Sequence, residues 1–263
     1  MSDIGLDVEV TDGVAWLRFN RPEKRNACDF PTRKFLLESI ARVRTDPAIR
    51  AAVVTGRGSA FCAGADLKDL TGDMDVERDN VAADGSTIHW AHIFEAIWSN
   101  EKPFLAAVNG PAAGFGCNLA FACDLIIASE QAQFIEAFVR RGLPLEAGAA
   151  YILPRMTSVH RAKEMALFGD PVSGRDAERW NLVNLCVPHD QFEATVGEWA
   201  ARLANGPTVR MGQIKQQINN SLDSQREHTF RQEVWLLAAG GGKDSTEAMS
   251  AWREKREPHF TGQ

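Results

Sequence analysis

The segment KPFLAAVNGPAAGFGCNLAFACD (residues 102–124) decides the fold, because it joins two apolar elements through a tight turn. Residues 103–123 carry no charge, and an apolar run of this length could cross a bilayer. The Asn-Gly-Pro sequence at 109–111 is a strong turn signal in the middle of the run, however. We therefore expect a buried strand at 104–108, a turn and a buried helix at 114–122, with no membrane span.

The rest of the chain alternates strands with helices and then becomes helical. Two β-rich runs flank Asp12 and Gly13, which predicts a hairpin. Asp29, with a proline two residues later, predicts the start of a helix. We expect strands at 6–10, 14–19, 51–55, 124–128 and 182–187, helices at about 87–100, 147–154, 158–169 and 175–180, an irregular segment at 136–147, and a polar loop at 71–86.

This order predicts an α/β core of parallel strands, joined by right-handed crossovers, with a helical C-terminal appendage. The pattern is helical from Gln191 onward, broken at 206–207 and 240–242. We assign residues 1–190 to the core and residues 191–263 to a helical C-terminal region.

The composition is that of a globular protein. The chain has 263 residues, is 44% hydrophobic and carries a net charge of −6, which makes a broad nucleic-acid-binding face improbable. Its five cysteines are odd in number and form no CxxC pair, so we expect reduced, buried thiols. No histidine or cysteine spacing suggests a metal site. The acidic N-terminus does not resemble a signal peptide, and we expect a cytoplasmic protein.

Two glycine-lined segments are candidates for chemistry. FCAGADL (residues 61–67) and NGPAAGFGCNL (residues 109–119) each follow a buried strand and open a helix. Small residues there let a ligand approach the backbone, and two N–H groups that converge on one oxygen would make an oxyanion hole. The alternative is tight packing of a helix on a sheet. Neither segment is a Walker loop or a dinucleotide-binding fingerprint.

Together these segments resemble the crotonase superfamily, that is, the enoyl-CoA hydratase/isomerase family. Further matching elements extend the resemblance from about residue 8 to residue 260. They are the NRP…NA element at 20–27, AQFIEAFVRRGL at 132–143 and DSTEAMSAWREKREPHF at 244–260.

The resemblance implies a crotonase-like spiral of ββα turns whose helical C-terminal region builds homotrimers, often paired into hexamers. It also implies an acyl-CoA thioester as the ligand, with coenzyme A as part of the substrate and no other cofactor. The thioester carbonyl would accept hydrogen bonds from the backbone N–H groups of Ala65 and Phe115. Phe115 replaces the glycine of many members, and its ring would shape the acyl pocket.

Other positions follow from the same resemblance. Trp90, Phe138 and Leu143 are candidates for the acyl pocket. Trp252 and Lys255 would touch the coenzyme A of a neighbouring subunit. The candidates for binding coenzyme A within the chain are Arg25, Ala27, Ala63, Asp66 and Leu67.

Side-chain catalysis is where the sequence departs from the family. Hydratases of the family use two glutamates, and the matching positions are Asn118 and Phe138, neither of which can exchange a proton. Glu146 resembles the single acidic residue of enoyl-CoA isomerases, although the neighbouring proline, Pro144, falls one place early. We predict that Glu146 is a general base; the alternative is that it only caps the following helix. Glu136 would reach the pocket if the local register shifted.

These features favour an enoyl-CoA isomerase that converts a 3-enoyl to a 2-enoyl thioester through an enolate. Three alternatives stay open: an enoyl-CoA hydratase that uses Asn118 to hold water, a non-catalytic acyl-CoA-binding protein, and a hydrolase that uses His89 or His92. The acyl chain is open too, with fatty acid metabolism one of several pathways.

Overall fold

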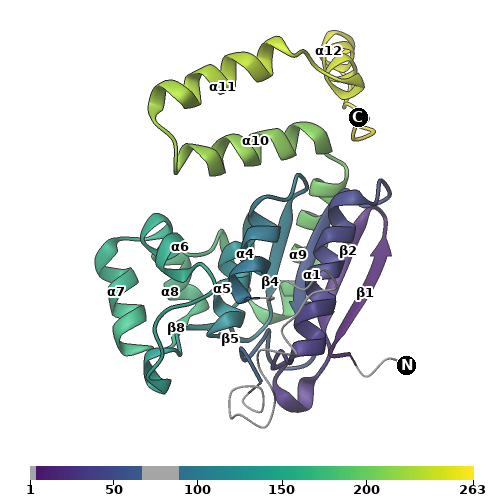
Figure 1. Ribbon diagram of the computed structural model, residues 1–263. Coiled ribbons are helices and arrows are strands. Elements are labelled where there is room, and N and C mark those ends of the chain that lie inside the picture. Colours follow the sequence, from purple (N-terminus) through teal and green to yellow (C-terminus); the bar gives the residue numbers. More distant parts are fainter. Residues whose placement is uncertain (1–3, 67–88) are drawn as a thin grey trace.

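The computed structural model describes residues 4–66 and 89–263. Its main sheet has the strand order β1-β2-β3-β4-β6-β9. Figure 1 shows this sheet, with β1 and β2 at one edge. β1 and β2 form the antiparallel hairpin predicted around Asp12 and Gly13, and each later neighbour is parallel. The strands are β1 (Leu6–Thr11), β2 (Val14–Phe19), β3 (Ala51–Gly56), β4 (Phe104–Val108), β6 (Leu125–Ser129) and β9 (Leu185–Val187).

A second, smaller sheet lies beside the first and was not predicted. It contains β5 (Pro111–Ala113), β7 (Gln133–Ile135) and β8 (Val172–Ser173) in the order β5-β7-β8. β5 runs parallel to β7 and lies between the turn and the helix of the segment that decides the fold. The small sheet thereby fixes where that helix, α5 (Phe115–Ala122), begins.

Helices cover both faces of the main sheet. The N-terminal helix starts as predicted, because the Asp29 carboxylate accepts a hydrogen bond of 3.0 Å from the Thr32 N–H. The helices of the core are α1 (Phe30–Thr45), α4 (Trp90–Trp98), α5 (Phe115–Ala122), α6 (Ala149–Met156), α7 (Val159–Phe168), α8 (Gly174–Arg179) and α9 (His189–Ala204), with short 3-10 turns η1 (Pro22–Lys24) and η2 (Val139–Arg141).

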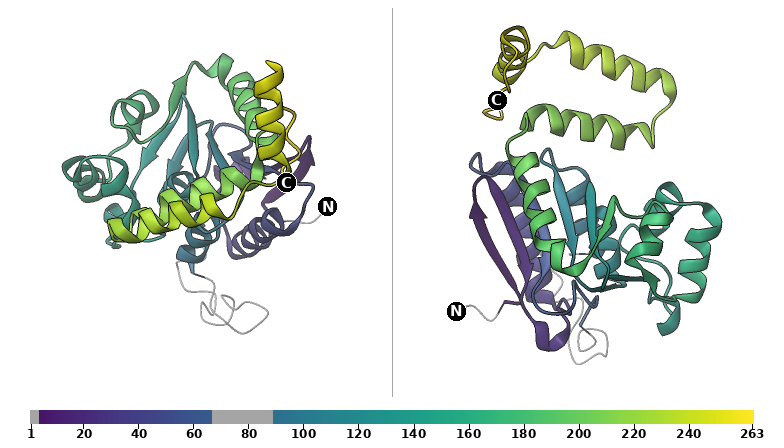
Figure 2. Two further views of the ribbon diagram at one scale, coloured as in Figure 1. Left: turned by 90° about the horizontal axis from the view of Figure 1, so that it is seen from above. Right: turned by 180° about the vertical axis from the view of Figure 1, so that it is seen from behind.

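The apolar core is divided by the sheet. On one face, α1, α4 and α5 enclose buried rings that include Phe19, Phe61 and Phe104. On the other, α9 buries Phe192 and Val196 against the main sheet (Figure 2). α9 therefore belongs to the layered core, although most of its residues lie beyond the boundary at residue 190 that we expected.

The last three helices extend away from the sheets (Figures 1 and 2). They are α10 (Thr208–Ser221), α11 (Arg226–Ala238) and α12 (Lys243–Glu254). Their role as a separate oligomerisation region remains a prediction.

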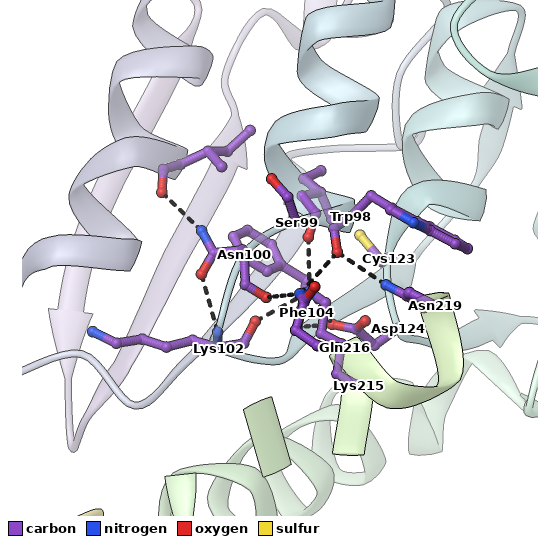
Figure 3. Close-up of polar contacts among 12 residues, drawn as sticks. Trp98, Ser99, Asn100, Lys102, Phe104, Cys123, Asp124, Lys215, Gln216 and Asn219 are labelled. Atoms are coloured by element: carbon purple, nitrogen blue, oxygen red, sulfur yellow. Dashed lines mark hydrogen bonds and ion pairs between the residues drawn. The ribbon is translucent and has the colours of Figure 1, made fainter. Parts of the chain in front are cut away.

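A buried lysine docks α10 onto the core (Figure 3). The Lys215 ammonium donates to the Ile97 carbonyl at 2.7 Å and pairs with the Asp124 carboxylate at 3.0 Å. The Asp124 carboxylate also accepts a 2.7 Å hydrogen bond from the Phe104 N–H. Burial raises the pKa of Asp124 more than Lys215 lowers it. Asn219, one turn further along α10, donates to the Trp98 carbonyl at 2.9 Å.

The remaining expectations concern loops and cysteines. η2 lies within the segment predicted to be irregular, and the predicted loop at 71–86 lies outside the described residues. All five cysteines are buried free thiols, as predicted. Within residues 4–66 and 89–263, no helix is long and apolar enough to cross a membrane.

Candidate active site

The two glycine-lined segments meet backbone to backbone. A Cβ atom added to Gly64 would lie 2.8 Å from the Ala113 carbonyl oxygen and 3.7 Å from the Phe115 nitrogen. Gly64 itself has φ +95°, a conformation that favours glycine. The sequence therefore needs glycine here so that the two segments can approach each other.

The backbone N–H of Ala65 points away from the segment around Cys28, with which Ala65 forms a β-bridge. The residues on either side of it bond to Cys28: Gly64 accepts from the Cys28 N–H at 2.8 Å, and the Asp66 N–H donates to the Cys28 carbonyl at 3.0 Å. In this parallel bridge the Ala65 N–H and C=O point to the opposite side. In the described part of the chain, no backbone carbonyl accepts from the Ala65 N–H.

Phe115 supplies the second N–H from the start of α5. It is the first residue of the helix, so its N–H has no partner within the helix. Gly114 before it has φ +52° and ψ −120°, which an L-residue rarely adopts, and this turn aims the N–H. The positive end of the helix dipole adds to its attraction for an anion.

Both N–H groups belong to residues that line one cavity of about 80 Å³. The acyl-pocket candidates Trp90, Phe138 and Leu143 line the same cavity, as does Ala63. Trp90 and Phe115 pack together with ring centroids 4.2 Å apart. Glu146 is the one acidic residue among the described residues that line the cavity.

A strained turn presents Glu146. Ala147 has φ +54° and Gly148 has φ +83°, so two successive residues are left-handed before α6 begins. Gly148, not Glu146, is the N-cap of α6, and no side chain caps that end among the described residues. The geometry therefore gives no support to the alternative in which Glu146 only caps the helix.

The surroundings of Glu146 shift the pKa of its carboxyl group upward. Burial raises this pKa, and Arg33 and His89 oppose the shift by less. A raised pKa makes a carboxylate a stronger base towards a substrate C–H bond. Arg33 lies with its guanidinium carbon 4.4 Å from the centre of the Trp90 ring.

Asn118 and Phe138 occupy the positions where the resemblance implies glutamates. Asn118 is buried in α5, and its side-chain amide donates a 3.0 Å hydrogen bond to the Glu146 carbonyl oxygen. Phe138 offers only its ring to the cavity. Asn118 thus contacts the backbone of Glu146, whereas the Asn118 Oδ1 atom is buried with no hydrogen-bond partner among the described residues.

Glu136 lies beside this arrangement and not in the cavity lining. Its side chain is fully buried, and neither carboxyl oxygen has a partner with hydrogen-bond geometry in the described part of the chain. Burial raises its pKa to about 7, although the nearby side chains of Cys117 and Asn118 act in the opposite direction. With this pKa, Glu136 holds its proton at mildly acidic pH and loses it around neutrality.

The residues expected to bind coenzyme A separate into two groups. Arg25 and Ala63 lie on adjoining segments, since the Ala63 N–H donates to the Arg25 carbonyl at 3.0 Å. Asp66 instead pairs with Arg21 at 3.0 Å. Ala27 lies on the Arg25 segment and accepts from the Arg21 guanidinium at 2.9 Å.

The other candidates lie away from the cavity or outside the described chain. Leu67 belongs to the undescribed residues. Trp252, which is 75% exposed, and Lys255 lie on and just after α12, which is remote from α5 (Figure 1). Within one chain they do not line the cavity.

The histidines and one arginine complete the surroundings. His89 precedes α4 and is exposed, and its backbone N–H donates to His92 Nδ1 at 3.2 Å. Sequence reasoning missed Arg141, which lines the cavity next to Leu143. Its signal was an arginine pair just before the GLP sequence, in a segment for which we expected no regular structure.

Two residues with outward-facing backbone N–H groups and one carboxylate thus line a single cavity, an arrangement suited to an enzyme that stabilises an anion. Residues 9–263 match the family described as enoyl-CoA hydratase/isomerase, and the chain belongs to that family. A probable enoyl-CoA hydratase of Rhodobacter capsulatus is 37% identical over 263 residues, which is all of both chains. The 1,2-epoxyphenylacetyl-CoA isomerase of Escherichia coli K12 is 35% identical over 96% of this chain and 97% of its own.

The fold agrees with solved structures. The enoyl-CoA hydratase of Bacillus anthracis superposes with a TM-score of 0.89 at 28% identity, covering 98% of this chain and 100% of that one. The crotonase-like α/β fold predicted from sequence is thereby confirmed.

Proposed function

We propose that the protein is an enoyl-CoA isomerase that moves a carbon–carbon double bond from the 3,4 to the 2,3 position. The observation that carries the proposal is that Glu146 lines the same cavity as the Ala65 and Phe115 backbone. A 1,3-proton shift needs one base and one anion-binding site, and these residues supply both.

The reaction would proceed in two proton transfers. The Glu146 carboxylate takes a proton from C2, and the electron pair of that C–H bond forms a dienolate whose charge rests on the thioester oxygen. The Ala65 and Phe115 N–H groups donate to that oxygen. Glu146, now an acid, returns the proton to C4, and the double bond forms between C2 and C3. No atom is gained or lost.

Hydration is the second candidate, because a relative that spans the whole chain is named a probable enoyl-CoA hydratase. That reaction would need a second proton-transfer group beside Glu146. Glu136 is absent from the described lining of the cavity, and Asn118 is engaged with the Glu146 carbonyl. The geometry therefore favours isomerisation, and a binding protein without turnover is the outcome if neither reaction occurs.

The first experiment gives purified protein a short 3-enoyl-CoA and follows the absorbance of the conjugated 2-enoyl thioester. We expect turnover by the wild type and its loss in Glu146→Gln. Glu198→Gln, which alters an exposed residue of α9, is the matched control and retains activity. A parallel assay for water addition to a 2-enoyl-CoA distinguishes the hydratase. If acyl-CoA binds but neither product forms, the isomerase proposal fails.

We further propose that the chain forms a homotrimer or a dimer of trimers. Large apolar side chains remain exposed on the last three helices of the single chain. They are Val209, Ile214 and Ile218 on α10, Leu222 directly after it, and Phe230, Val234, Trp235, Leu237, Met249 and Trp252 further on. Burying such a surface would stabilise an assembly and would bring Trp252 and Lys255 to a neighbour's coenzyme A. Light scattering after size-exclusion chromatography tests the subunit number.

Three further expectations are carried forward as proposals. Coenzyme A belongs to the substrate, and no separate cofactor or metal is proposed. The Arg25–Ala63 surface would contact the pantetheine and nucleotide. The cytoplasmic location and a role in fatty acid metabolism rest on the sequence and the family.

A further inference from the structure

Glu136 is a buried acid for which the proposed reaction has no use. Its side chain is 0% exposed, and it follows directly after β7. Burying a carboxyl group without a hydrogen-bond partner costs free energy, and an ionised one costs considerably more. A natural sequence that places glutamate in such a site needs a compensating interaction nearby.

Asn118 offers that interaction. Its Nδ2 atom donates to the Glu146 carbonyl, and its Oδ1 atom is buried without a partner in the described part of the chain. Oδ1 can only accept a hydrogen bond, and a protonated carboxyl group can donate one. The unsatisfied acceptor of Asn118 and the unsatisfied acid of Glu136 are therefore complementary while Glu136 keeps its proton.

We propose that neutral Glu136 is a positioning residue for Glu146: it donates to Asn118 Oδ1 and so directs the Asn118 amide onto the Glu146 carbonyl. This inference rests on the proposed function, because the residue that is positioned is the proposed base. Asn118 holds the start of the left-handed turn at Ala147 and Gly148, whose strain makes an outside restraint useful.

Ionisation of Glu136 would break this arrangement. A carboxylate repels Oδ1 and attracts the amide N–H, so Asn118 would turn its donor from Glu146 to Glu136. The titratable group that faces Glu136 within the described residues is the Cys117 thiol, whose pKa burial raises well above its ordinary value, so that it stays neutral. Gly169, which follows α7, lies against the Glu136 backbone carbonyl and carries no charge, and the Arg140 guanidinium beside it pairs with the exposed Asp170. The reorientation of the Asn118 amide would therefore depend on the ionisation of Glu136 itself.

The test compares Glu136→Gln with Glu136→Leu across pH. Gln keeps an uncharged donor for Asn118, whereas Leu removes it. We expect the wild-type kcat to fall above about pH 7, the Gln variant to lose that alkaline decline, and the Leu variant to lose about 10- to 100-fold in kcat at every pH with KM changed far less. The acid side of each profile, which reports Glu146, should persist.

Three activity outcomes would overturn the proposal. Complete loss in Glu136→Gln, equal to that in Glu146→Gln, would mean that Glu136 exchanges a proton with the substrate. An unchanged alkaline decline in Glu136→Gln would assign that decline to another group. Full kcat in Glu136→Leu would show that Asn118 needs no donor.

A second measurement does not depend on turnover. The side-chain amide protons of Asn118 are followed by NMR as pH is raised, in the wild type and in Glu136→Gln. We expect their signals to move with a midpoint near pH 7 in the wild type only. If the wild type shows no isomerisation but this titration is present, the proposed function fails and the hydrogen-bond arrangement stands. A flat titration in the wild type overturns the inference.

Discussion

The side-chain amide of Asn118 donates a 3.0 Å hydrogen bond to the backbone carbonyl of Glu146. It connects α5, which begins at Phe115, to the turn that carries the only described acidic residue of the cavity lining. Where the family resemblance implies a catalytic glutamate, this chain has an amide that bonds to the backbone of another residue. In the reaction proposed above, Glu146 would be the single base and Asn118 its support, unlike a two-glutamate design.

Replacing Asn118 should lower turnover without removing it. Asn118→Ala leaves the Glu146 carbonyl with one fewer donor and releases the turn, so we expect kcat to fall about 10- to 100-fold. The binding constant for a non-reactive acyl-CoA should change much less. Asn205→Ala, at an exposed helix end, is the control. Equal kcat values for wild type and Asn118→Ala would show that Glu146 needs no such restraint.

Gly114→Ala should damage the anion site through the backbone alone. An added Cβ has room, since the nearest atom within 4 Å, Phe138 Cζ, is 3.8 Å away. The substitution is unfavourable because Gly114 has φ +52° and ψ −120°, which strains an alanine backbone. Relaxing that strain would turn the Phe115 N–H away from the substrate. We expect a loss of about 100-fold in kcat or more.

Gly142→Ala is the matched control for this substitution. Gly142 has φ +70° and ψ 20°, which is ordinary left-handed helix, and nothing lies within 4 Å of the added atom. It should cost about 1 kcal/mol of stability and little activity. If both variants behave alike, the special conformation of Gly114 has no part in catalysis.

Much of the fold could be predicted because its signals are local. The Asp-Gly hairpin, the Asp29 cap and the uncharged strand-turn-helix segment all express themselves within a few residues. β5 and β8 were missed because each has only two or three residues, too few to show alternation. Their pairing depends on segments that are distant in sequence.

The parts of the candidate site that belong to sequence motifs could be predicted, whereas the contacts that depend on tertiary packing could not. The Ala65 and Phe115 segments and Glu146 follow from the family resemblance. The Asn118–Glu146 bond spans 28 residues, and nothing in the sequence shows that Glu136 is buried behind it. Arg141 was missed because an arginine at a loop end gives no sign of which way it faces.

Phe115 should control acyl selectivity and not the chemistry. Its N–H belongs to the backbone, so Phe115→Leu keeps the anion site. The ring packs 4.2 Å from Trp90, and a smaller side chain enlarges the cavity. We expect kcat/KM to rise for bulkier acyl groups relative to short ones, with a stability loss of about 1–3 kcal/mol. An unchanged order of substrates would remove Phe115 from the specificity determinants.

The ion pair between Lys215 and Asp124 should matter most when only one partner is removed. Lys215→Met leaves a buried carboxyl group without its cation, and we expect a loss of about 3–5 kcal/mol in the free energy of unfolding. The double variant Lys215→Met/Asp124→Asn should recover part of that loss. Denaturant unfolding at fixed protein concentration measures both, and additive losses would contradict coupling between the two side chains.

Glu136 should make the protein less stable as pH rises towards neutrality. Its pKa lies near 7 in the folded chain and near its ordinary 4.5 when unfolded, so between these values the native state holds one more proton. Stability therefore falls by about 1.4 kcal/mol per pH unit across that window, roughly 3 kcal/mol in total, and levels off above pH 7. Glu136→Gln cannot titrate and should lack this component.

The quantity to measure is the difference in unfolding free energy between wild type and variant, from urea unfolding at several pH values and one protein concentration. Taking the difference removes the contribution of Asp124, whose pKa is also raised. A difference that stays constant from pH 5 to pH 8 would mean that Glu136 is ionised in the folded protein, and the neutral donor proposed for Asn118 would not exist.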